Sequence, residues 1–240
     1  MSLLEVRHLV KSFGAVKVAD DLCFTLEKGE ALGVIGPNGA GKSSMFHLIG
    51  GSLKPASGQI LLDHADITGL PPAQRCRAGI ARTFQVPQPF SGMTVFENLL
   101  VPAAFGAGAA ESDSYRHCVQ VLEQTGLWGK ANRPAGTLTL LERKRLELAR
   151  ALAARPRLLL LDEIAGGLTE HETAQLVETI TEINRAGTAI IWIEHIVHAL
   201  TAVVKRLIVI NFGAKVAEGS PGEVMESAIV RRIYMGIEVA

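Results

Sequence analysis

A stretch near the N-terminus combines glycines, a lysine and a serine at fixed spacing. It runs from Gly36 to Ser43, reads Gly-Pro-Asn-Gly-Ala-Gly-Lys-Ser, and fits the pattern G-x-x-x-x-G-K-[S/T] of a phosphate loop. Glycines let successive backbone N–H groups turn toward one anion, the lysine adds a point charge, and the serine hydroxyl is a ligand for Mg²⁺. A nucleoside triphosphate with Mg²⁺ is therefore the expected ligand, whereas an ordinary glycine-rich turn does not need the Gly-Lys-Ser triplet.

A second candidate group lies where buried strands end. Four leucines at 158–161 predict a buried strand that ends in Asp162 and Glu163. In a parallel sheet such ends face the ligand crevice, where an aspartate can hold Mg²⁺ and a glutamate can orient or deprotonate water. Another strand predicted at 189–193 leads to His195, which either donates to a γ-phosphate or is an ordinary structural residue.

Two further side chains have both a functional and a structural interpretation. Gln85 ends a strand predicted at 80–85, before prolines that break regular structure. It can reach Mg²⁺ and the attacking water, or be an exposed loop amide. Phe13 lies in the predicted connection between two strands, where it can stack on a nucleobase or anchor the core.

The surrounding elements must position these residues. A short buried strand at 31–35 precedes the phosphate loop, and a helix begins at 44–49. Partly alternating strands are predicted at 3–9 and 16–26, in a pattern typical of an antiparallel sheet with one wet face. A further strand, at 59–63, closes a first nucleotide-binding half.

The residue pattern changes in the middle of the chain, and the new pattern predicts an inserted helical lobe. An Ala/Gly stretch at 103–110 is followed by a helix from residue 112 or 113 to Gly126. Thr139 and Glu142 form the T-x-x-E pattern of a capping box, so a helix should start there. Later residues predict an amphipathic helix at 173–184, a hairpin between 207 and 217, and a helical remainder.

Length and composition favour one α/β domain, with a smaller inserted lobe, in a chain of 240 residues. The 24 Lys and Arg residues equal the 24 Asp and Glu residues, which argues against a nucleic-acid partner. The three cysteines form no C-x-x-C pair and suit a reducing cytosol better than a disulfide scaffold or a zinc site. The sequence shows neither a signal core nor an apolar run of ~20 residues. We therefore expect a cytoplasmic location, with any role at the membrane being peripheral.

Over nearly its whole length the chain resembles the ATP-binding subunit of an ABC transporter. The resemblance rests on an ordered set of features, which are the phosphate loop, Gln85, the capped helix, Asp162-Glu163 and His195. The resemblance implies an α/β fold with a P-loop NTPase (RecA-like) core, an antiparallel β subdomain and an inserted α-helical subdomain. It implies a single domain over 1–240, with the nucleotide-binding core at 1–85 and 157–240. The helical subdomain is expected at about 86–156.

The same resemblance implies roles for individual residues. Those expected to bind ATP are Phe13, through adenine stacking, and Gly36, Pro37, Asn38, Gly39, Ala40, Gly41, Lys42, Ser43 and Ser44. Those expected to contact Mg²⁺ are Ser43, Gln85 and Asp162. Catalysis is expected of Glu163, with His195 at the γ-phosphate and Gln85 at the attacking water.

Less specific segments, at 193–196, 209–213, 216–224 and 234–236, resemble the branched-chain amino acid group of importers. They imply an ATPase that powers import of branched-chain or related amino acids or small organic solutes, on the inner face of the cell membrane. The implied partners are integral membrane permease subunits, a second ATPase subunit, identical or different, and indirectly a solute-binding protein. The alternatives are a soluble ABC ATPase not coupled to transport and a regulatory subunit with weak hydrolysis.

Two segments depart from the family pattern. The signature loop, typically Leu-Ser-Gly-Gly-Gln/Glu, is Leu-Thr-Leu-Leu-Glu at 138–142, with leucines at Leu140 and Leu141 where the glycines are expected. The segment after Glu163 ends at Thr169, where many members have Asp. The departures predict a weakened site at the signature helix and altered communication between two ATP sites.

Overall fold

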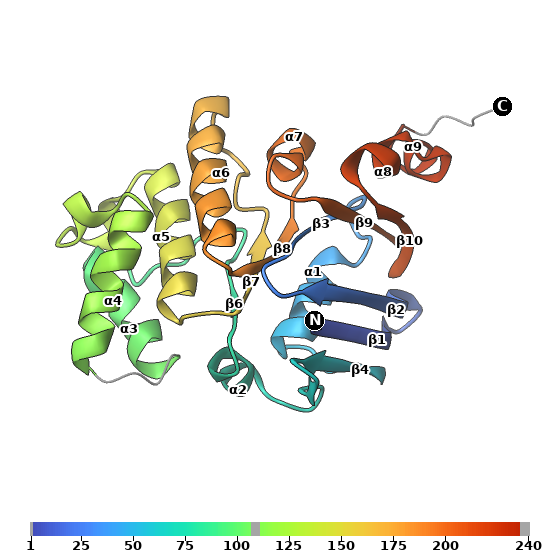
Figure 1. The fold of residues 1–240 in the computed structure, drawn as a ribbon, viewed down its shortest axis with the longest axis horizontal. Helices are drawn as coiled ribbons and strands as arrows, with labels where there is room; N and C mark the ends of the chain where they lie inside the picture. Colours follow the sequence, from blue (N-terminus) through green and yellow to red (C-terminus); the bar gives the residue numbers. More distant parts are fainter. Residues whose placement is uncertain (1, 107–110, 236–240) are drawn as a thin grey trace.

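The computed structural model describes residues 2–106 and 111–235, and its centre is a six-stranded sheet (Figure 1). The strand order is β10-β9-β3-β8-β7-β6, and all neighbours except the antiparallel β10 and β9 run parallel. The strands are β3 (Ala31–Ile35), β6 (Ile80–Arg82), β7 (Leu158–Asp162), β8 (Ala189–Ile193), β9 (Arg206–Asn211) and β10 (Ala214–Gly219). The carboxyl ends of the parallel strands therefore meet at one edge.

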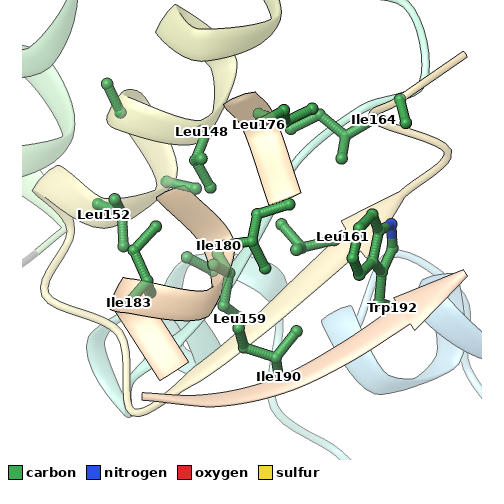
Figure 2. Packing of buried hydrophobic residues seen from close by; sticks show 14 of the residues in the cluster. Leu148, Leu152, Leu159, Leu161, Ile164, Leu176, Ile180, Ile183, Ile190 and Trp192 are labelled. Atoms are coloured by element: carbon green, nitrogen blue, oxygen red, sulfur yellow. The ribbon is translucent and has the colours of Figure 1, made fainter. Parts of the chain in front are cut away.

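Both faces of this sheet are buried, in two separate cores. Leu159 and Leu161 of β7 pack toward α5 (Leu140–Ala153) and α6 (Glu170–Arg185), as Figure 2 shows. The alternate residues, Leu158 and Leu160, belong to the core that contains α1 (Lys42–Gly50). A strand buried on both faces needs apolar residues at every position, which accounts for the run of four leucines.

A second sheet lies beside α1 and shares its core. It has the order β2-β1-β4-β5, from β1 (Ser2–Phe13), β2 (Val16–Glu27), β4 (Ser57–Leu62) and β5 (Ala65–Asp66), and all its pairs are antiparallel. The antiparallel pairing expected of the first two strands is confirmed, and so is the later hairpin, formed by β9 and β10.

The helices α3 (Val95–Phe105), α4 (Glu111–Gln124) and α5 gather at one end of the molecule (Figure 1). Helix α3 was not predicted, and residues 107–110 of the Ala/Gly stretch lie outside the described residues. The remaining helices are α2 (Pro72–Arg77), α7 (Val197–Thr201), α8 (Pro221–Glu226) and α9 (Ala228–Met235), with 3₁₀ turns at Trp128–Lys130 and Ala135–Thr137. Within the described ranges, none of the helices has the length and apolar character needed to cross a bilayer.

Strand β6 ends at Arg82, earlier than the prediction that extended it to Gln85. The Thr83 N–H still donates to the Leu160 carbonyl, at 2.9 Å, but the pairing stops there. The backbone of Phe84 and Gln88 is hydrogen-bonded instead to the buried carboxylate of Glu147 on α5. Gln85 is therefore in a loop held by the helical end of the molecule.

Candidate functional site

The loop between β3 and α1 is held between two strands, so it needs glycine at both ends. A Cβ atom on Gly36 would lie 2.2 Å from the carbonyl oxygen of Ile210, on β9. A Cβ on Gly41 would lie 2.4 Å from the carbonyl oxygen of Val18, on β2, and Gly41 has φ 103°. Larger residues would push the loop open, so the glycines let it curl tightly enough to surround an anion.

The loop leads into the N-terminus of α1, which no side chain of the described residues caps. The N-cap residue of α1 is Gly41, which makes no side-chain capping bond, and the first turn contains no acidic residue. The N–H groups at the start of a helix carry a partial positive charge. Here that charge is left for a bound anion.

Lys42 places its ammonium group inside this loop. Its Nζ donates to the carbonyl oxygens of Gly36 at 2.6 Å and Pro37 at 2.9 Å. Burial lowers the pKa of Lys42, and the nearby carboxylates of Glu163 and Asp162 partly oppose that shift. These charge–charge interactions indicate that the phosphate loop and the end of β7 belong to one site.

The remaining predicted nucleotide contacts follow the loop and the first turn of α1. Asn38, Gly39 and Ser43 are exposed, Pro37 and Ser44 are half-buried, and Ala40 is buried.

Phe13 is the last residue of β1 rather than part of the connection, and its side chain is 54% exposed beneath the Lys11 ammonium. The alternative that Phe13 anchors the core is therefore wrong.

Three of the predicted residues meet at the end of β7. Nε2 of Gln85 donates to Oε2 of Glu163 at 2.5 Å, and Oε1 of Glu163 lies 2.6 Å from Nε2 of His195. Glu163 itself has φ 45°, in the left-handed region. Side chains from two other segments thus hold both oxygens of one carboxylate.

Asp162 is held by contacts that the sequence analysis missed. Its Oδ2 accepts a hydrogen bond from Arg82 at 2.6 Å, and its backbone N–H donates to Oγ1 of Thr83 at 3.2 Å. Arg82 also lies over the rings of Phe46 and Phe84. The sequence signal for Arg82 was a cation in the predicted strand at 80–85, directly after the apolar Ile80 and Ala81.

Lys144 is a second missed residue, and it joins α5 to the site. It is 3% exposed, and its Nζ donates to the backbone oxygens of Gln85 at 2.7 Å and Glu163 at 3.3 Å. Burial lowers the pKa of Lys144, while Glu194 and Glu163 oppose the shift. A lysine four residues before the buried Leu148, on the apolar face of α5, was the available signal.

The N-terminus of α5 is capped by side chains of the helix itself. Thr139 and Glu142 form the predicted capping box, each accepting from the other's backbone N–H. The Glu142 carboxylate also pairs with Lys130. Leu140 is 46% exposed at this helix end and Leu141 is half-buried.

Known proteins resemble the chain over its length. The family model "ABC transporter" matches residues 19–166. The high-affinity branched-chain amino acid transport ATP-binding protein LivG of Salmonella typhimurium is 36% identical over 98% of both chains. The lipopolysaccharide export system ATP-binding protein LptB of Haemophilus influenzae is 31% identical, also over 98% of both.

The fold agrees with these sequence matches. A crystal structure of the ADP conformation of an ATP-binding cassette of an ABC transporter superposes with a TM-score of 0.89 at 30% identity. The superposition covers 99% of this chain and 100% of that one. The expected architecture, a P-loop NTPase core of the ABC ATPase type, is confirmed. The chain therefore belongs to the ABC transporter family, as an ATP-binding subunit that hydrolyses ATP.

Proposed function

We propose that this chain powers an importer of branched-chain amino acids, related amino acids or small organic solutes. Its identity to LivG, 36% over 98% of both chains, supports this solute class. The observation that carries the ATPase assignment is the convergence of Gln85 and His195 on the Glu163 carboxylate, beside the phosphate loop.

ATP and Mg²⁺ fit the residues present. The loop from Gly36 to Ser43, with Ser44 after it, surrounds the phosphates through backbone N–H groups, and Lys42 adds its charge. Phe13, exposed at the end of β1, stacks on the adenine. The residues proposed to hold Mg²⁺ are Ser43, Gln85 and Asp162. When bound, Mg²⁺ neutralises charge on the β- and γ-phosphates.

The chemistry is in-line attack of water on the γ-phosphorus. The bond to the bridging oxygen breaks, ADP leaves, and the proton of the water passes to the Glu163 carboxylate. Gln85 and His195 hold that carboxylate in place, and His195 contacts the γ-phosphate. Most of the acceleration comes from positioning and charge neutralisation.

The permease docks in a pocket between the helical lobe, at about 86–156, and the nucleotide-binding core. The pocket has a volume of about 380 Å³ and is lined by α1, α2, β6, α3 and α5. Phe84 lines it and is 53% exposed, while the lining arginines Arg82 and Arg150 are already paired with carboxylates, so a permease segment with apolar side chains is the matching partner. Because Phe84 adjoins Gln85, and Arg82 holds Asp162, docking acts on the site directly.

A second ATPase subunit, identical or different, joins head to tail, so that the α5 N-terminus faces the partner's phosphate loop. A solute-binding protein acts only through the permease. The assembly places the chain on the cytoplasmic, inner face of the cell membrane. The alternative of a regulatory subunit with weak hydrolysis is motivated by Leu140 and Leu141 in place of glycines.

Copurification tests the proposal. Tagged full-length chain is purified from native membranes, and the bound integral membrane proteins are identified by mass spectrometry. We expect permease subunits, and we expect Phe84→Asp to lose them while its melting temperature shows an intact fold. Capture of ribosomes or nucleic acid without any permease would support the soluble ATPase instead.

A further inference from the structure

A cluster of three potential metal ligands lies on the antiparallel sheet, outside the nucleotide site. His8 is on β1, and Asp21 and Cys23 are on β2. One ligand atom from each, an imidazole nitrogen, a carboxylate oxygen and a thiol sulfur, can be chosen so that all lie within 4.8 Å of one another. Three different ligand types, from two strands, therefore share one small volume.

A β-bulge creates this arrangement. Val6 pairs with Phe24 and Leu9 pairs with Leu22, so Arg7 and His8 together face the single residue Cys23. Both His8, at φ 47°, and Asp21, at φ 52°, have left-handed backbone. Bulges re-aim side chains relative to the regular alternation of a strand. Here the result is that His8 contacts both Asp21 and Cys23.

The separation between Cys23 and His8 agrees with a tetrahedral metal site, and the one between His8 and Asp21 needs a small adjustment. Cys23 Sγ lies 3.6 Å from His8 Nδ1. Zinc bonds of about 2.3 Å to sulfur and about 2.0–2.1 Å to nitrogen, at a tetrahedral angle, give a separation of about 3.6 Å. His8 Nδ1 and Asp21 Oδ1 are 2.8 Å apart. The same tetrahedral geometry requires this separation to increase to about 3.3 Å. The increase is feasible because the Asp21 side chain is 70% exposed.

The surroundings favour a metal-bound thiolate. The His8 backbone N–H donates to Cys23 Sγ at 3.0 Å, an outer contact that stabilises charge on the sulfur. His8 and Cys23 also line a surface pocket of about 490 Å³, which has room for water as a fourth ligand.

We propose that His8, Asp21 and Cys23 bind a divalent transition metal ion of the Zn²⁺ class. Binding releases the Cys23 thiol proton to solvent, and bonds form from the ion to the sulfur, Nδ1 and a carboxylate oxygen. This mixed S, N, O set favours Zn²⁺ over Mg²⁺. The site therefore differs in metal chemistry from the one at the phosphate loop, and the ion links β1 to β2 at the bulge.

Cysteine spacing did not predict this site, because only one of its ligands is a cysteine. The ligands are also separated along the chain by the turn between β1 and β2. Only the register of the bulge brings them together.

The test is titration of the full-length chain, without nucleotide, with Co²⁺ alone and then with Zn²⁺. We expect a thiolate-to-cobalt absorption band that saturates at one ion per chain and is displaced by Zn²⁺. Cys23→Ser should abolish the band and weaken Zn²⁺ affinity by about 100-fold, whereas Asp21→Asn should weaken it by about 10-fold. The matched control Cys76→Ser should bind like the unmodified chain.

His8→Asn removes the imidazole while keeping a residue type that tolerates left-handed backbone, so it should fold and lose the site. Circular dichroism and thermal melting check the fold of each variant. Absence of the band with the unmodified chain, or Zn²⁺ affinity unchanged in both Cys23→Ser and His8→Asn, would overturn the proposal.

Discussion

In the proposed head-to-tail assembly, the N-terminus of α1 belongs to the chain's own ATP site and that of α5 to the partner's, and the two differ in what they offer an anion. At α1 a glycine occupies the cap position, no side chain caps the helix, and Lys42 adds a cation. At α5 Thr139 and Glu142 cap the helix, and the carboxylate of Glu142 is already at the positive end of its dipole.

The difference indicates separate tasks for the two helix ends. An uncapped helix N-terminus that keeps its N–H groups for a ligand binds phosphate in a single chain. The self-capped end of α5 presents the exposed Leu140, and in the proposed assembly it would complete the partner's site. The α5 helix also reaches its own site through the buried Lys144.

The largest expected effect is at α1. Lys42→Ala should lower ATP affinity by at least about 100-fold, because charge-assisted bonds to the phosphates are lost. Equilibrium titration with ATP and Mg²⁺ measures it, with the exposed Lys205→Ala as a matched control. Unchanged affinity would contradict the assignment of the phosphate loop as the ATP-binding element.

The next effect separates binding from turnover. Glu163→Gln should keep ATP affinity and slow hydrolysis by roughly 100-fold or more, because the proton acceptor for water is lost. Phosphate release by the assembled complex is the measurement, and Glu178→Gln, on an exposed face of α6, is the control. Normal turnover in Glu163→Gln would mean that another group accepts the proton of the attacking water.

A smaller effect is expected on the α5 side. Lys144→Met should lower kcat by about 10-fold, since the carbonyl groups of Gln85 and Glu163 lose their shared donor.

Because Lys144 positions other residues, KM for ATP should change little, and Lys144→Arg should restore part of kcat. A change confined to KM, or one that follows a lower melting temperature, would indicate a different role.

The smallest effect tests the α5 N-terminus itself. The double variant Leu140→Gly, Leu141→Gly should raise ATPase activity of the assembled complex, because it allows closer approach of a partner's γ-phosphate. The gain is smaller if product release or transport limits the rate. Lower activity with an intact fold would mean that the leucines belong to an adapted interface.

The phosphate loop and the strand ends could be predicted because each is local in sequence. The loop needs a fixed set of residue types between 36 and 43, and a buried strand followed by acidic residues marks 158–163. Their meeting follows from parallel strands ending at one edge. The capping box of Thr139 and Glu142 is likewise a local pattern, and it is present.

The contacts that join distant segments could not be predicted in this way. Arg82 holds Asp162, 80 positions later, and Lys144 binds the carbonyl of Gln85 across 59 positions. Their partners depend on packing between the helical end and the sheet. Helix α3 is different, because the capping box at Thr94 and Glu97 is a local pattern from which its start could be predicted.

Hydrogen exchange of the intact chain, with and without ATP and Mg²⁺, tests the central comparison most directly. In the unassembled chain, ATP should slow exchange of the amides at 36–44 and leave those at 140–142 unchanged, because only the α1 end is open to an anion. Protection at 140–142 without protection at 36–44 would contradict the account.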